Sequence, residues 1–241
     1  HPSWTGGGSA WRDWARTPLW RRAVVLRAAA QQLRDHADFL AGFLVEEVAK
    51  PAKDARSEIL RSADLIDYTA EEGVRLLAQG QLLASDAFQG ADRTKLCLAS
   101  PVPLGVVLCI PPFNYPVNLA CSKIAPALIA GNAVVLKPPS QGALSGVLMA
   151  RCFQLAGLPD GLLNVVTGRG REIGDYLVEH PSVNCISFTG GDTGLAIARK
   201  AGMVPLQMEL GGKDACVVCA DADPFQKMIR SFTGHHSIGA E

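Results

Sequence analysis

The strongest constraint on the fold is a run of short apolar segments that alternate with amphipathic segments through the second half of the chain. Leu104–Ile110 is apolar at nearly every position and ends at Pro111-Pro112, and a helical periodicity follows over Val117–Ile129. Three further strand–helix pairs are Ala133–Lys137 with Ala143–Ala156, Leu162–Val166 with Glu172–Glu179, and Asn184–Phe188 with Thr193–Ala201. Two more apolar runs, Val204–Leu210 and Ala215–Cys219, have strand length. Apolar strands separated by helices predict an α/β fold, with a parallel sheet that helices cover on both faces.

The N-terminal third predicts a helical layer that precedes this sheet. Apolar residues recur every three or four positions in one helix that begins at Thr17-Pro18 and is closed by Pro51, with Thr17 as its cap. A second apolar stripe runs from Ile59 to Leu77. The alternating segment Arg93–Pro103 predicts an exposed strand, which favours self-association because its edge invites pairing.

Composition excludes several kinds of partner and site. The 23 basic and 23 acidic residues balance, so no net field draws the chain to nucleic acid or to an anionic membrane. Although 48% of the residues are apolar, the sequence has no uninterrupted apolar run of transmembrane length, and its N-terminus lacks the pattern of a signal peptide. Because the sequence begins at His1, an upstream targeting segment would lie outside it. Seven scattered cysteines predict free thiols and a cytoplasmic location.

Ligands of a parallel sheet bind beyond the carboxyl ends of the strands, which directs attention to the segments that follow each strand. These segments are Pro111-Pro112-Phe113-Asn114-Tyr115, Lys137-Pro138-Pro139-Ser140, Thr167-Gly168-Arg169-Gly170, Thr189-Gly190-Gly191 and Glu209. We expect them to meet at one edge of the sheet.

Each of these residues also has a purely structural interpretation. Glu209 lies in an apolar run, where burial would raise its pKa and suit a general base, but a salt bridge at a strand end fits equally well. Asn114 offers an amide donor for an oxyanion, or a turn-forming side chain. Lys137 can meet a phosphate or remain solvated. Gly190-Gly191 can present N–H groups to an anion, or serve only the geometry of the turn.

Other motifs carry weaker signals. The glycines at 168, 170 and 174 miss the spacing of a dinucleotide fingerprint by one residue. Cys216 and Cys219 would point to opposite faces of a strand, and His235-His236 lacks other ligands nearby in the sequence, so we expect no metal site.

Taken together, the segments resemble the N-terminal half of an aldehyde dehydrogenase, from about Trp14 to Asp223. The matching motifs are Phe113-Asn114-Tyr115-Pro116, Ala130-Gly131-Asn132, Leu136-Lys137-Pro138, Phe188-Thr189-Gly190 and Glu209-Leu210-Gly211-Gly212-Lys213. Longer forms of these motifs are similar to the non-phosphorylating, NADP-dependent glyceraldehyde-3-phosphate dehydrogenases of plants and algae. The resemblance implies a Rossmann-like sheet and helical layer within residues 1–208, and the start of a catalytic domain at 209–241.

The resemblance also implies roles for individual residues. In the family a cysteine thiolate attacks the aldehyde, hydride passes to the nicotinamide, and a glutamate activates the water that hydrolyses the thioester. Glu209 matches that glutamate, Asn114 matches the amide that holds the substrate oxygen, and Tyr115 and Arg75 would meet a substrate phosphate. Ser140 stands where NAD-preferring relatives often carry a glutamate, which favours NADP. The residues implied in NADP binding are Ile110, Pro111, Pro112, Lys137, Ser140, Gly168, Phe188, Thr189, Gly190, Gly191, Thr193, Leu210 and Gly211.

The resemblance has one departure. The nucleophilic cysteine of the family follows the glutamate by roughly thirty-odd residues, and no cysteine in this sequence takes that position. The expected full-length activity is NADP-dependent oxidation of glyceraldehyde 3-phosphate to 3-phosphoglycerate by a homodimer or homotetramer. The 241 residues alone are expected to be inactive, and the alternative is a non-catalytic NADP-binding fragment or a degenerate family member.

Overall fold

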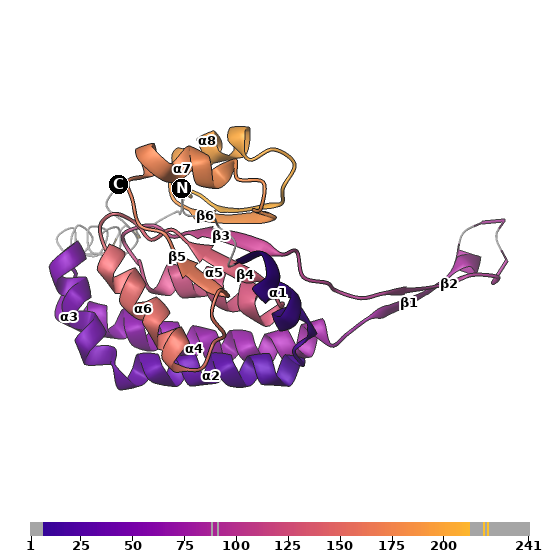
Figure 1. The fold of residues 1–241 in the computed structure, drawn as a ribbon, viewed down its shortest axis with the longest axis horizontal. Coiled ribbons are helices and arrows are strands. Elements are labelled where there is room, and N and C mark those ends of the chain that lie inside the picture. The colour runs from indigo at the N-terminus through magenta and orange to yellow at the C-terminus, as the bar shows by residue number, and fades with distance from the viewer. Residues whose placement is uncertain (1–6, 88, 91, 213–218, 220, 222–241) are drawn as a thin grey trace.

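A computed structural model describes residues 7–87, 89–90, 92–212, 219 and 221 (Figure 1). The N-terminal layer contains α1 (Gly7–Arg16), α2 (Leu19–Asp35), α3 (Ala37–Val48) and α4 (Ala52–Leu77). The hairpin strands β1 (Gln81–Ala84) and β2 (Leu96–Ala99) follow, with the short 3-10 helix η1 (Ser85–Ala87) between them. The remaining elements are β3 (Val106–Ile110), α5 (Asn118–Ile129), β4 (Ala133–Leu136), α6 (Ala143–Leu155), β5 (Leu163–Val165), α7 (Gly170–Val178), β6 (Cys185–Thr189), α8 (Thr193–Lys200) and β7 (Leu206–Glu209).

The five strands β3 to β7 form one parallel sheet in the order β5-β4-β3-β6-β7. The chain winds from β3 towards β5, then crosses back to place β6 on the other side of β3. Because the direction of winding reverses there, the loops after β3 and β6 diverge and leave a crevice at their carboxyl ends. The predicted doubly covered parallel sheet is confirmed.

Helices cover the two faces of the sheet unequally. Figure 1 shows α7 and α8 on one face, and α5 and α6 with the long helices α2 and α4 on the other. The thicker side has a core in which Leu26, Ile66 and Leu128 are fully buried. The thinner side packs Leu177 and Ile197 against the sheet. The apolar spacing of the strands and helices therefore accounts for three stacked layers.

The N-terminal layer corrects two expectations about helix ends. The helix predicted to run from Pro18 to Pro51 is two helices, because the backbone at His36 (φ −107°, ψ 16°) leaves the helical range between α2 and α3. Thr17 does not cap α2; its hydroxyl instead donates to the carbonyl of Asp13 at 3.1 Å, and Pro18 occupies the cap position. The apolar stripe continues across the break, so periodicity alone does not reveal it.

A two-stranded antiparallel hairpin extends away from the body of the molecule (Figure 1). Its strand β2 lies within the predicted exposed strand Arg93–Pro103, whereas its partner β1 was not predicted. Leu82 and Leu98 are 69% and 76% exposed.

All but the last residue of the predicted strand Ala215–Cys219, and most of the predicted second unit at 209–241, lie outside the described residues. Within the described part, no helix combines the length and apolarity needed to cross a membrane.

Candidate functional site

A pocket of about 690 Å³ lies at the carboxyl ends of the strands, where the winding of the sheet reverses. Its walls come from the loop after β3, one face of α5, the ends of β6 and β7, and one residue of α4. The pocket brings together Asn114, Tyr115, Thr189, Glu209 and Leu210, which the sequence had singled out from three separate segments. The expectation that these segments meet is therefore confirmed for these five residues.

The turn that carries Asn114 is held in a defined shape. The amide oxygen Oδ1 of Asn114 accepts a hydrogen bond from the backbone N–H of Tyr115 at 2.9 Å. This bond fixes the plane of the amide group and hence the direction of its Nδ2 donor. Asn114 and Tyr115 are both half-buried, so each still reaches the pocket. A donor held in this way can stabilise negative charge that develops on a substrate oxygen.

Glu209 is exposed, which contradicts the expectation of a buried carboxylate. Neighbouring positions of β7 point to opposite faces, and Glu209 shares the more exposed face with Gln207. The apolar neighbours Met208 and Leu210 in the sequence do not enclose it. Its carboxylate nevertheless lines the pocket together with Asn114.

Lys123 is a pocket residue that the sequence interpretation missed. It projects from α5 and donates a hydrogen bond to Thr189 Oγ1 at 2.6 Å, which joins the helix to the end of β6. Burial lowers its pKa, while the nearby Cys109 and Glu209 act in the opposite direction. The sequence feature that could have revealed Lys123 is a single lysine among the apolar residues on the buried face of α5.

The helices that start at this edge differ in what occupies their N-termini. Glu58 of α4 accepts hydrogen bonds from the backbone N–H groups at the start of α5, at 2.9 and 3.1 Å. Glu47 of α3 does the same at the start of α6, at 2.8 and 2.7 Å. Helix α7 carries Glu172 in its first turn, whereas α8 has no acidic residue in its first turn. Helix N-termini attract anions, and α8 is the one of these four whose first turn suits a phosphate, although Asp192 stands at its N-cap position without a side-chain hydrogen bond to the helix.

The loop before α8 has a more limited set of donors than the sequence suggested. The N–H of Gly190 already donates to the carbonyl of Glu209 at 3.1 Å, so this loop is tied to the end of β7. Gly194 lies so close to Leu210 that a β-carbon would approach its side chain to 2.4 Å. Gly191 and Thr193 are the expected cofactor residues left at the start of α8; Gly191 is half-buried and Thr193 is exposed. Phe188, at the end of β6, is buried.

The other residues implied in cofactor binding follow β3, β4 and β5 at the same edge of the sheet. Lys137 is buried, and its ammonium group donates to the carbonyl of Pro138 at 3.1 Å; burial lowers its pKa. Ser140 is exposed three residues later. Ile110, Pro111 and Pro112 follow one another at the end of β3, and Gly168 precedes α7. None of these six residues lines the pocket around Asn114.

Arg75, an expected phosphate-binding residue, does not lie at this pocket. It sits at the far end of α4, is exposed, and forms an ion pair with Glu72 at 2.5 Å. Arg61, on the same helix, lines the pocket instead. At 1.5 Å per residue, the fourteen positions between them separate the two arginines by about 21 Å along the helix axis.

The cysteines near the pocket do not have the properties of nucleophiles. The six cysteines in the described residues are all free thiols, as expected. Cys109 lies on β3 and Cys121 on α5, and both are fully buried. Burial raises the pKa of the Cys109 thiol to about 12 and also raises that of Cys121. Because the thiolate is the reactive form, both are inert near neutral pH. Cys216 lies outside the described residues, as do His235 and His236.

Comparisons with known proteins agree with this geometry. The family model described as "Aldehyde dehydrogenase family" matches residues 7–237. NADP-dependent glyceraldehyde-3-phosphate dehydrogenases from Triticum aestivum and Arabidopsis thaliana are 67% and 66% identical, each over 89% of this chain. The chain spans only 43% of the length of these two relatives.

A solved structure shows the same arrangement. The NADP-dependent glyceraldehyde-3-phosphate dehydrogenase from Bacillus halodurans, in complex with NADP, superposes with a TM-score of 0.89 at 46% identity. The similarity covers 96% of this chain and 48% of that structure.

Proposed function

This chain belongs to the aldehyde dehydrogenase family, and we propose that it forms the cofactor-binding half of an enzyme that oxidises glyceraldehyde 3-phosphate with NADP. The observation that carries the proposal is the convergence of Asn114 and Glu209 in one pocket at the switch point of the sheet. Its relatives named above are NADP-dependent glyceraldehyde-3-phosphate dehydrogenases, which supports both the cofactor and the substrate.

The residues at the carboxyl edge fit NADP. The first turn of α8 contains no acid and suits the pyrophosphate, with Gly191 and Thr193 beside it, and the Asp192 side chain at the N-cap position forms no hydrogen bond to the helix. Lys137 places a cation at the same edge. Three residues later Ser140 brings no carboxylate that would repel a 2'-phosphate. Ile110, Pro111, Pro112, Gly168, Phe188, Leu210 and Gly211 complete the proposed set. When bound, NADP supplies the hydride acceptor for aldehyde oxidation.

The pocket residues divide the remaining chemistry between them. Asn114 holds the aldehyde oxygen and stabilises the negative charge that develops when a thiolate adds to the carbonyl carbon. Glu209 accepts a proton from the water that then releases the acid product. The balanced reaction converts an aldehyde, water and NADP into a carboxylate, NADPH and two protons. Cys109 and Cys121 are too deeply buried to act, and none of the six described cysteines lines the pocket. We therefore assign the nucleophile to a segment outside the described residues.

The pocket also fits a phosphorylated substrate. Arg61 contributes a cation and Tyr115 a phenol at the wall next to Asn114. A guanidinium group matches the geometry of a phosphate, whereas Arg75 is too far along α4 to do so. We therefore assign the phosphate contact to Arg61 and Tyr115.

The exposed hairpin supports a homo-oligomer. Leu82 and Leu98 project from an arm whose apolar side chains pack on little of this chain. Replacing both by lysine is expected to lower the molecular mass of the assembly measured by light scattering. An unchanged mass would remove the hairpin from the interface.

A second candidate is a module that binds NADP without catalysis. It is favoured for the isolated chain by the inert thiols beside the pocket. The two candidates make different predictions for a completed enzyme, in which this chain is fused to the part of the Triticum aestivum relative that it does not match.

Two measurements test the proposal. Calorimetry on the chain itself is expected to show NADP binding tighter than NAD binding, and Lys137→Met is expected to abolish that preference. The completed enzyme is expected to form NADPH from glyceraldehyde 3-phosphate, with loss of turnover in Glu209→Gln and Asn114→Ala. NADP binding without turnover in the completed enzyme would favour the second candidate, and no NADP binding would refute both.

A further inference from the structure

We propose that Lys50 and Glu58 act as a positioning pair for the Asn114–Tyr115 turn. The inference rests on the proposed function of Asn114 and extends it to two residues of the N-terminal layer. Neither of them lines the pocket, so an effect on turnover must pass through the pocket residues that they contact. Lys50 contacts only the turn among these, whereas Glu58 also bonds to the start of α5.

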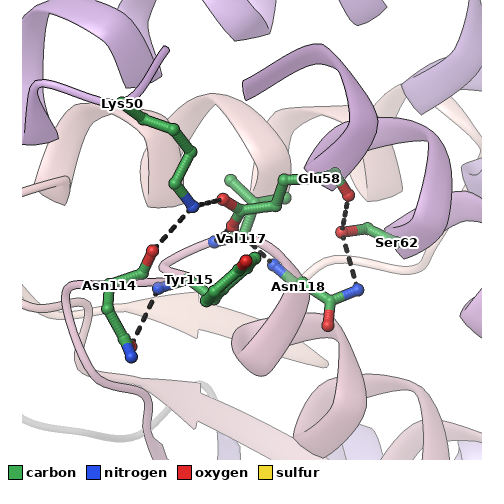
Figure 2. Close-up of polar contacts among 7 residues, drawn as sticks. All are labelled: Lys50, Glu58, Ser62, Asn114, Tyr115, Val117 and Asn118. Atoms are coloured by element: carbon green, nitrogen blue, oxygen red, sulfur yellow. Dashed lines mark hydrogen bonds and ion pairs between the residues drawn. The ribbon is translucent and has the colours of Figure 1, made fainter. Parts of the chain in front are cut away.

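Lys50 contacts the turn in two ways (Figure 2). Its ammonium group donates to the backbone carbonyl of Asn114 at 2.6 Å. The same nitrogen lies over the ring of Tyr115, 3.7 Å from the ring centroid, which is within range of a cation–π interaction. The side chain of Lys50 is only 10% exposed, so these contacts are shielded from water. One ammonium group therefore fixes both residues of the turn.

Glu58 holds Lys50 from the opposite side. Its Oε2 atom forms an ion pair with the Lys50 ammonium, and its Oε1 atom accepts hydrogen bonds from the N–H groups of Val117 and Asn118. The Glu58 side chain is fully buried. A carboxylate can serve both sets of donors because each oxygen accepts, whereas a glutamine has only one acceptor oxygen. Glu58 thus anchors the Asn118 end of this segment directly and the Asn114 end through Lys50.

The arrangement is more than a structural ion pair between helices. An ordinary pair such as Arg56–Asp38, 54% and 83% exposed, joins α3 to α4 without touching the pocket. The Lys50–Glu58 pair instead ends on the residue that we assign to the substrate oxygen. Since misplacement of a catalytic donor by about 1 Å can cost about 100-fold in rate, the pair is expected to act on kcat.

The first experiment measures coupling in the completed enzyme. Asn114→Ala is expected to lower kcat about 100-fold and Lys50→Met about tenfold. Lys50→Met is also expected to raise KM, because Lys50 lies over the ring of Tyr115, to which the phosphate contact is assigned. If Lys50 acts through Asn114, adding Lys50→Met to Asn114→Ala will lower kcat by less than about twofold. The matched control is Glu47→Gln, which weakens the start of α6 away from this turn; its effect is expected to multiply with that of Asn114→Ala. Equal Lys50→Met effects in both backgrounds would overturn the proposal.

The second experiment does not depend on activity. NMR on the 241-residue chain measures the hydrogen-exchange rate of the Tyr115 backbone N–H, which donates a hydrogen bond to Asn114 Oδ1. Lys50→Met is expected to speed its exchange about tenfold or more, while Arg56→Met leaves it unchanged. Unchanged Tyr115 protection in Lys50→Met would refute the positioning role even if the completed enzyme proves inactive. Conversely, faster exchange in a protein without turnover would support the pair and refute only the proposed function.

Discussion

Glu47→Ala is expected to be the most destabilising single change among the surface-accessible acids of the N-terminal layer. The Glu47 carboxylate accepts from the N–H groups of Leu144 and Ser145, at 2.8 and 2.7 Å, and from the Ser145 hydroxyl at 2.6 Å. Removing a helix N-cap costs about 0.5–2 kcal/mol, and hydrogen bonds to a charged acceptor about 1.5–3 kcal/mol each when shielded. Glu47 is half-buried and Leu144 is exposed, so we discount these values to a total of about 2–3 kcal/mol.

The assay is unfolding monitored by circular dichroism, in urea for the free energy of unfolding and on heating for the melting temperature. For a domain of this size a loss of about 2–3 kcal/mol corresponds to a fall of about 5–10 °C in the melting temperature. Glu47→Gln keeps one acceptor oxygen and is expected to lose about half as much. The control is Glu46→Ala, because Glu46 is exposed and is the immediate neighbour. A Glu47→Ala variant within about 0.5 kcal/mol of the native chain, or one no worse than Glu46→Ala, would refute the capping argument.

Three further outcomes are expected. The pKa of Lys123 lies below its ordinary value of 10.5, so the free-energy cost of burying the charged lysine is full at low pH and disappears as the pH rises towards 10.5. The urea midpoint of the native chain should therefore rise relative to that of Lys123→Met between about pH 7 and about pH 10, and a constant difference would contradict this. Ser140→Glu is expected to weaken NADP binding about tenfold by calorimetry while sparing NAD, and equal weakening of both would contradict the assignment. In the folded chain, mass spectrometry should find a thiol reagent on exposed Cys97 but not on Cys109 or Cys121, whose labelling without denaturant would contradict their burial.

The sheet was predictable from the sequence because its strands are apolar on both faces. Strand assignments such as Val106–Ile110 and Cys185–Thr189 agree with the predicted runs within about two residues. The hairpin partner Gln81–Ala84 was missed because its four residues, three exposed and one half-buried, carry no alternation of burial. The pattern of apolar residues predicts a strand only where one face of that strand packs against a helix or another part of the core.

The site was predictable only where the sheet itself places a residue. Asn114 follows β3 and Glu209 ends β7, so the parallel topology brings them to one edge. Arg61 and Arg75 differ by fourteen positions, nearly four turns, and therefore lie on similar faces of α4. Periodicity cannot distinguish them, because only the docking of α4 decides which one reaches the pocket. Glu58 was detectable in principle, since it shares the spacing of buried Ala55 and Ser62.

The two acidic caps of the N-terminal layer have a consequence for the order of folding during synthesis. Glu58 and Glu47 bond to helix starts that lie about 60 and 97 residues later in the chain. Helices α5 and α6 therefore emerge from a ribosome after the carboxylates that complete their first turns. We expect the early helices to act as a template on which the first half of the sheet assembles. Protein made without residues 1–50 should then aggregate during translation, because α6 would meet neither its cap nor its packing surface.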